Sequence, residues 1–71
     1  MKALIKYKDV YGNRRQKTIQ VDRNEPNYII GEFVYQCDLP SFIYVYTIKC
    51  GRFEYQWYGP VKDGALRYYK Y

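Results

Sequence analysis

Histidine is absent from this chain, and the other residues that carry enzyme chemistry are scarce. Because histidine is the commonest general base and metal ligand, its absence removes the usual centre of a catalytic site. Ser41 is the one serine, and it lies beside Pro40 outside any Gly-x-Ser-x-Gly pattern. Cys37 and Cys50 have no histidine to activate them and do not form a zinc site by themselves. We therefore expect no enzymatic activity, no bound metal and no cofactor.

Long apolar runs and nucleotide-binding loops are also missing. No segment approaches the roughly 18 apolar residues that a membrane span needs, and Met1 leads into an alternating strand pattern rather than a secretory leader. No glycine-rich loop precedes a helix, which excludes a P-loop and a dinucleotide fingerprint. The two cysteines lie in apolar segments, so we expect reduced, buried thiols rather than a disulfide. These features predict a cytoplasmic protein without membrane contact.

Positive charge, by contrast, is abundant and confined to one end. The net charge of +5 arises within the first 17 residues, where six lysines and arginines oppose the single acid Asp9. Beyond residue 17, six bases balance six acids. A basic edge on a neutral body suits a negatively charged partner, although it also serves solubility alone.

Aromatic residues are the second surplus. The chain has eleven tyrosines, three phenylalanines and one tryptophan. A domain this small buries only about 60% of its unfolded surface, so it cannot hide all of these rings. Several tyrosines are therefore expected to face solvent or a partner.

The first 21 residues predict a β-hairpin. Residues 2–10 and 15–21 alternate between apolar and polar side chains around a turn at 11–14. An odd-numbered loop pairs Tyr7 with Ile19 and Asp9 with Lys17, and it gives one apolar face. The same register pairs Ile5 with Val21. The outer face then carries Lys2, Lys6, Lys8, Gln16, Thr18 and Gln20.

Residues 24–37 fit a helix better than a strand. Their apolar residues fall on one helical stripe, Asn24 is placed to cap, and Pro26 suits the first turn. Gly31 and the β-branched residues argue against the helix. If residues 28–37 formed a strand instead, the chain would become a small all-β barrel of SH3-like or OB-like size.

The last third predicts three strands. Residues 42–50 are apolar on both faces, and Gly51-Arg52 is a hairpin loop that places Lys49 opposite Glu54 and Tyr46 opposite Trp57. Gly59-Pro60 is expected to end the strand that follows this loop. Asp63-Gly64 is expected to form a turn before an edge strand at 65–71. The whole chain, 1–71, is expected to form a single α+β domain: a small antiparallel sheet in ββαβββ order with one helix on a face.

The core is assigned to the apolar residues of these elements. The expected members are Ile5, Tyr7, Ile19, Val21, Ile30, Phe33, Val34, Tyr46, Ile48 and Trp57.

The candidate binding residues are the cations of the first hairpin and the tyrosines expected at its turn and on the last strand. They are Lys2, Lys6, Lys8, Tyr11, Arg14, Arg15, Lys17, Tyr68, Tyr69 and Tyr71.

With no catalytic centre, these residues predict a non-enzymatic binding module with a macromolecular partner, protein or nucleic acid. By analogy of size and fold, it resembles phage- or virus-type accessory proteins that inhibit or modulate a host nucleic-acid-handling complex by occupying its surface. The alternative is direct binding of single-stranded nucleic acid, with cations on phosphates and rings on bases. A homodimer through the edge strand 65–71 is a further hypothesis.

Overall fold

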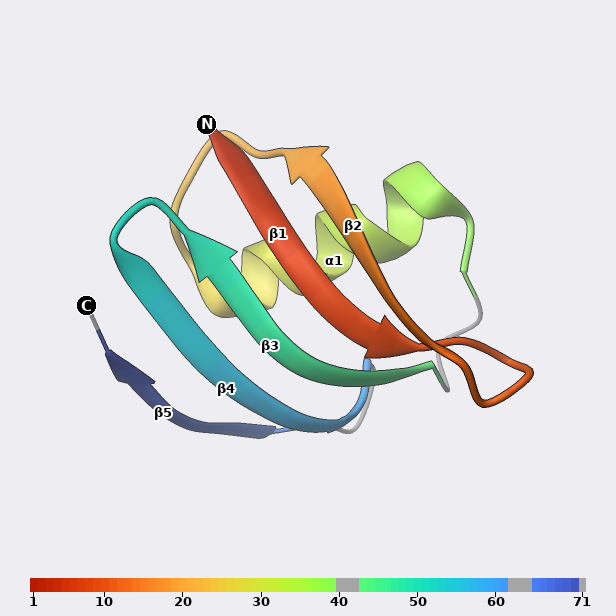
Figure 1. Ribbon diagram of the computed structural model, residues 1–71. Coiled ribbons are helices and arrows are strands. Elements are labelled where there is room, and N and C mark those ends of the chain that lie inside the picture. Colours follow the sequence, from red (N-terminus) through yellow and green to blue (C-terminus); the bar gives the residue numbers. More distant parts are fainter. Residues whose placement is uncertain (40–42, 62–64, 71) are drawn as a thin grey trace.

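The computed structural model describes residues 1–39, 43–61 and 65–70, the last range by its backbone alone. Its elements follow the order β1 (Lys2–Lys8), β2 (Arg14–Gln20), α1 (Pro26–Cys37), β3 (Tyr44–Cys50), β4 (Phe53–Pro60) and β5 (Ala65–Lys70). The ββαβββ order of an α+β fold is confirmed (Figure 1). The alternative small barrel is wrong, because the segment that it needed as a strand is helical.

All five strands join one antiparallel sheet in the order β2-β1-β3-β4-β5. β1 and β2 form the first hairpin, and α1 then crosses one face of the sheet so that β3 adds to the free side of β1 (Figure 1). The sheet therefore has a helix face and an open face. β2 lies at one edge and β5 at the other, as expected for the last strand.

The hydrophobic core fills the space between α1 and the helix face. Phe33 of α1 is fully buried, and its ring meets the ring of Tyr7 edge-on at 5.1 Å. Most of the expected core is confirmed, but Val34 is only half-buried, and Tyr46 is half-buried on the open face. Further buried residues, which the expected core did not include, are Ala3, Ile29, Ile43, Val45, Tyr55 and Val61.

The register of the first hairpin differs from the predicted one. Tyr7 lies opposite Arg15 rather than Ile19, and the loop spans the five residues 9–13. The Asp9 carboxylate accepts the backbone N–H groups of Tyr11 and Asn13, each at 2.9 Å, and this closes the loop. The odd loop length is confirmed, and the outer face keeps its predicted members because the slip is an even number of residues.

Helix α1 begins at Pro26, one residue later than a cap at Asn24 would place it, and Asn24 does not cap it. Glu25 is the N-cap and makes no side-chain cap hydrogen bond. The Asn24 side-chain oxygen instead accepts the Tyr55 hydroxyl at 2.7 Å, and this ties the start of the helix to β4. At the other end, Asp38 adopts the left-handed conformation (φ 51°) and its N–H bonds the carbonyl of residue 34.

Both cysteines are free, but they differ in burial. Cys50 is fully buried, whereas Cys37 is half-buried at the end of α1, so the prediction of two buried thiols is wrong for Cys37. It is the last residue of the helix and packs against the core while remaining partly exposed.

The hairpin between β3 and β4 has the predicted Lys49–Glu54 pair, which is confirmed. The predicted pair of Tyr46 with Trp57 is wrong, because the register shifts between residues 45 and 47. Gly59 does not end β4: it adopts φ 128°, pairs with Val45 and lets the strand continue to residue 60. The predicted turn at 63–64 lies outside the described residues.

Candidate functional site

The open face of the sheet carries the positive charge of the first hairpin. Side chains alternate along a strand, so Lys2, Lys6 and Lys8 of β1 point away from the buried Ala3, Ile5 and Tyr7. The cross-strand register adds Arg14 of β2 and Lys49 of β3 to this face. Among the described side chains, Glu54, opposite Lys49, is the one carboxylate that the register places there. Five cations against one acid make the open face strongly positive.

Three tyrosines lie among these cations. Tyr44 and Tyr46 of β3 are in tilted ring contact at 5.0 Å, and Tyr58 of β4 is 41% exposed. Tyr46 and Thr47 are consecutive yet both line the open face, because the register shift between β1 and β3 makes residue 46 an extra residue, a β-bulge. The bulge brings the Tyr46 ring to the polar side of the sheet.

Register shifts occur at the same level in successive strand pairs. They fall at Lys6/Tyr7 against β3, at Val45/Thr47 against β4, and at Gln56/Trp57 against β5. Because bulges bend and twist the strands that carry them, this level is where we expect the sheet to curve. The hollow of the open face lies there.

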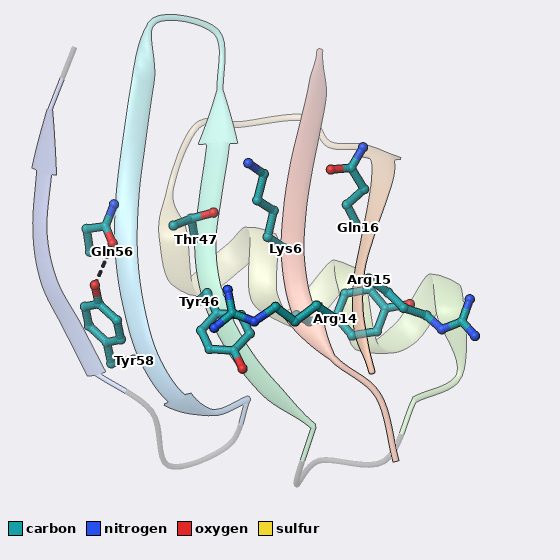
Figure 2. A pocket seen from close by; sticks show the side chains of 9 residues that line it. Lys6, Arg14, Arg15, Gln16, Tyr46, Thr47, Gln56 and Tyr58 are labelled. Carbon is teal, nitrogen blue, oxygen red and sulfur yellow. Dashed lines mark hydrogen bonds between the residues drawn. The ribbon is translucent and has the colours of Figure 1, made fainter. Parts of the chain in front are cut away.

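The hollow has a volume of about 730 Å³ and is formed by side chains from four strands (Figure 2). Its lining residues are Lys6, Tyr7, Arg14, Arg15, Gln16, Tyr46, Thr47, Gln56 and Tyr58. It therefore combines positive charge, aromatic rings, two amides and a threonine hydroxyl in one recess.

Gln56 is the buried polar residue among the described side chains, with 6% exposure. Its side-chain oxygen accepts the Tyr58 hydroxyl at 3.0 Å, and its amide nitrogen donates to Glu54 at 3.3 Å (Figure 2 shows the first bond). These two bonds fix which way the amide points. Gln56 therefore holds Tyr58 in place at the β4 side of the hollow.

Arg14 reaches across the sheet to Tyr46. Its guanidinium carbon lies 4.9 Å from the centre of the Tyr46 ring, a cation–π contact that Figure 2 shows above the strands. β1 lies between the two parent strands, so the arginine side chain spans it. Both residues of this contact line the hollow.

The predicted site residues fall into three groups, of which the first is gathered on the open face. It consists of Lys2, Lys6, Lys8 and Arg14.

The register places the second group on the helix side of the sheet, although Arg15 also lines the hollow. Arg15 and Lys17 pair with Tyr7 and Ile5, so the register places both on the helix side of β2. The Nε of Arg15 donates to the Asp9 carboxylate at 2.6 Å. This bond, together with the backbone hydrogen bonds to Asp9, lowers the pKa of that carboxyl. The same bond and the charge of Asp9 raise the pKa of Arg15.

The third group comprises the predicted tyrosines. Tyr11 lies in the hairpin loop and is 85% exposed. Tyr68 and Tyr69 pair through their backbones with Gln56 and Tyr55, but their side chains lie outside the described part of the molecule. Tyr71 also lies outside the described residues.

Sequence reasoning missed the aromatic part of this site. Tyr44 was not singled out, and Tyr46 was assigned to the core, because residues 42–50 look apolar on both faces. The spacing of the two tyrosines, two residues apart, was the available signal for a shared face. The bulge that separates Tyr46 from the core, and the strand order that brings Arg14 to it, are not visible in the sequence.

Within the described ranges, no three side chains of cysteine, aspartate or glutamate come together in a way that could hold a metal ion. α1, the helix of the described residues, is neither long nor apolar enough to cross a membrane. Comparison with models of protein families, with curated proteins and with solved structures finds no match to this chain.

Proposed function

We propose that this chain binds single-stranded nucleic acid on the open face of its sheet. The observation that carries the proposal is the hollow in which Lys6 and Arg14 lie beside the ring of Tyr46. Cations that follow a phosphate backbone, with rings on which bases stack, are the shared features of single-strand binding surfaces.

The cations are placed to follow a backbone. Lys2, Lys6 and Lys8 repeat every two or four residues along β1, so they form a row roughly 20 Å long at about 3.3 Å per residue. Arg14 lies opposite Lys8 on the neighbouring strand and widens the row. Each phosphate that such a side chain neutralises releases counterions, and this release drives binding at low salt.

The rings favour a single strand over a duplex. In a duplex the base faces are stacked inside, whereas in a single strand they are available to aromatic side chains. Tyr46 and Tyr58 lie on adjacent strands beside the lysine row, and β2 to β4 together span about 14 Å at the usual strand spacing. This width accommodates the two or three bases that sheet-based platforms stack.

The remaining groups of the hollow suit base edges without selecting one base. Gln16 and Thr47 supply an amide and a hydroxyl, which both donate and accept hydrogen bonds. We therefore expect weak sequence preference, with affinity set by charge and stacking.

A pair of double variants tests the proposal. Lys6→Gln with Lys8→Gln removes two charges from the open face, whereas Lys17→Gln with Arg52→Gln removes two from the helix side of β2 and the β3–β4 loop. Binding of a labelled single-stranded oligonucleotide is measured by fluorescence anisotropy at low salt. The first variant should bind about 30-fold more weakly than the wild type, because it loses two phosphate contacts at about 1 kcal/mol each. The second should bind nearly as the wild type does, and equal losses in both would show that net charge alone is responsible.

A second experiment tests the protein-inhibitor hypothesis. A pulldown from lysate is carried out with and without nuclease. Loss of the bound material after nuclease treatment supports direct nucleic-acid binding. One stoichiometric protein that stays bound after nuclease treatment, together with no oligonucleotide binding by the purified chain, would contradict the proposal and support the inhibitor.

A further inference from the structure

The ring face of Tyr46 is already occupied in the protein alone. The Arg14 guanidinium lies over it at 4.9 Å, after crossing β1 from the edge strand (Figure 2). A base that stacked between guanidinium and ring would need about 7–8 Å between them, because each apolar contact requires about 3.5–4 Å. A base can therefore use this ring face only after the guanidinium has moved.

Arg14 is weakly held in its present position. It is exposed, and it lies directly opposite Lys8, a pair of like charges. The ion pairs found among the described residues engage Arg15 and Arg23 rather than Arg14. A cation–π contact at an exposed site is weaker than a charge-assisted hydrogen bond to phosphate. A phosphate near β2 would therefore draw the guanidinium off the ring.

The ring, by contrast, is fixed. Tyr46 is half-buried, and the ring of Tyr44 contacts it at 5.0 Å. The bulge at residue 46 determines which side of the sheet the ring faces. Movement of Arg14 would thus expose a preformed stacking surface rather than a mobile one.

We propose that this face of Tyr46 is a nucleobase-stacking subsite that Arg14 caps in the free protein, and that binding moves the guanidinium from the ring to a phosphate. The inference rests on the proposed function, and it assigns the stacking subsite and the residue that covers it. Arg14 then has two opposed effects: it strengthens phosphate binding and competes with base stacking.

Two neighbouring variants separate these effects. Arg14→Gln and Lys8→Gln each remove one charge from the same cross-strand position of the open face. Their affinities are measured for an oligothymidylate of about 12 nucleotides, within the usual range of single-strand site sizes. The comparison strand has the same length and backbone but carries abasic sugars. The ratio of the two affinities reports base stacking independently of phosphate contacts.

The expected result is a several-fold higher ratio, in favour of the thymidine strand, for Arg14→Gln than for Lys8→Gln or the wild type. Tyr46→Leu should lower the ratio about tenfold, the usual loss for one stacked base, whereas Tyr46→Phe should preserve it. Equal ratios for Arg14→Gln and Lys8→Gln would overturn the capping role. If the wild type bound neither strand, the proposed function itself would fail.

A second readout needs no mutation of the binding surface. In the free protein, the ring current of Tyr46 should shift the NMR signal of the Arg14 Nε–H proton upfield. Addition of the thymidine strand should remove this shift, whereas the abasic strand should remove only part of it, because its phosphates attract the guanidinium but no base competes for the ring. An Arg14 proton signal without any ring-current shift in the free protein would contradict the cap directly.

Discussion

Replacement of Phe33 by alanine tests how α1 is attached to the sheet. The Phe33 side chain is fully buried, and its ring meets the Tyr7 ring at 5.1 Å. The helix cannot settle into the space left by the ring, because both of its ends are tied to strands: Asn24 accepts the Tyr55 hydroxyl, and Gln36 donates to the carbonyl of residue 20. We therefore expect a persistent cavity.

The cost of that cavity is a large part of the stability of the domain. Removal of a buried phenylalanine ring costs about 3–5 kcal/mol, and a site that cannot relax falls in the upper half of this range. At roughly 0.05–0.15 kcal/mol per residue, the 71 residues have a total free energy of unfolding of about 4–11 kcal/mol. Phe33→Ala should therefore leave a free energy of unfolding of at most about 7 kcal/mol, and close to zero at the lower end of this range. Urea unfolding followed by circular dichroism measures the difference.

The control is Tyr35→Ala, which removes a ring from the same helix at a position that is 83% exposed. It should change the free energy of unfolding by no more than about 0.5 kcal/mol. Phe33→Leu, which keeps most of the volume, should cost about 1–2 kcal/mol and remains measurable if the alanine variant does not fold. Equal urea midpoints for Phe33→Ala and Tyr35→Ala would refute the packing of α1 described above.

Three further predictions concern the turn, the helix and the thiols. The bond from Arg15 is the main reason that the pKa of Asp9 lies below its ordinary value of 3.8. The ionised carboxylate therefore stabilises the fold above pH 3.8, and this stabilisation is lost as the pH falls through the lowered pKa. Asp9→Asn should thus reduce the difference between the urea midpoints at neutral pH and at about pH 3. Gly31 is exposed within α1, and an added Cβ would meet nothing within 4 Å, so Gly31→Ala should stabilise the protein by about 0.5–1 kcal/mol in the same assay. A thiol reagent should label Cys37 faster than Cys50 under native conditions, because Cys50 is fully buried and burial raises the pKa of its thiol; equal rates would contradict this difference in burial.

Much of the fold could be predicted from local patterns. The hairpin at Gly51-Arg52 follows from turn chemistry and from the opposite charges of Lys49 and Glu54, and the structure has this pair. The helix at 26–37 follows from one apolar stripe and Pro26. The exact register of the first hairpin could not be predicted in this way. Pairing opposite charges placed Asp9 opposite Lys17, whereas the Asp9 carboxylate accepts hydrogen bonds from Tyr11, Asn13 and Arg15 and closes a five-residue loop.

The candidate site could be predicted only in part. The alternation of Lys2, Lys6 and Lys8 determines their shared face, and it is independent of the register. The aromatic half depends on a bulge at Tyr46 and on the position of β3 beside β1, both of which are tertiary features. No spacing in the sequence shows that Arg14 and Tyr46, which are 32 residues apart, are in contact.

The central claim, that the open face binds single-stranded nucleic acid, is tested most directly by the salt dependence of oligothymidylate binding. Three to five phosphate contacts should give a slope of log affinity against log salt of about −2 to −3.5, at about −0.7 per contact. The variant with Lys6→Gln and Lys8→Gln should flatten this slope by about 1.4, and the variant with Lys17→Gln and Arg52→Gln should leave it unchanged. A wild-type chain that does not bind at low salt, or a slope that both double variants alter equally, would contradict the account.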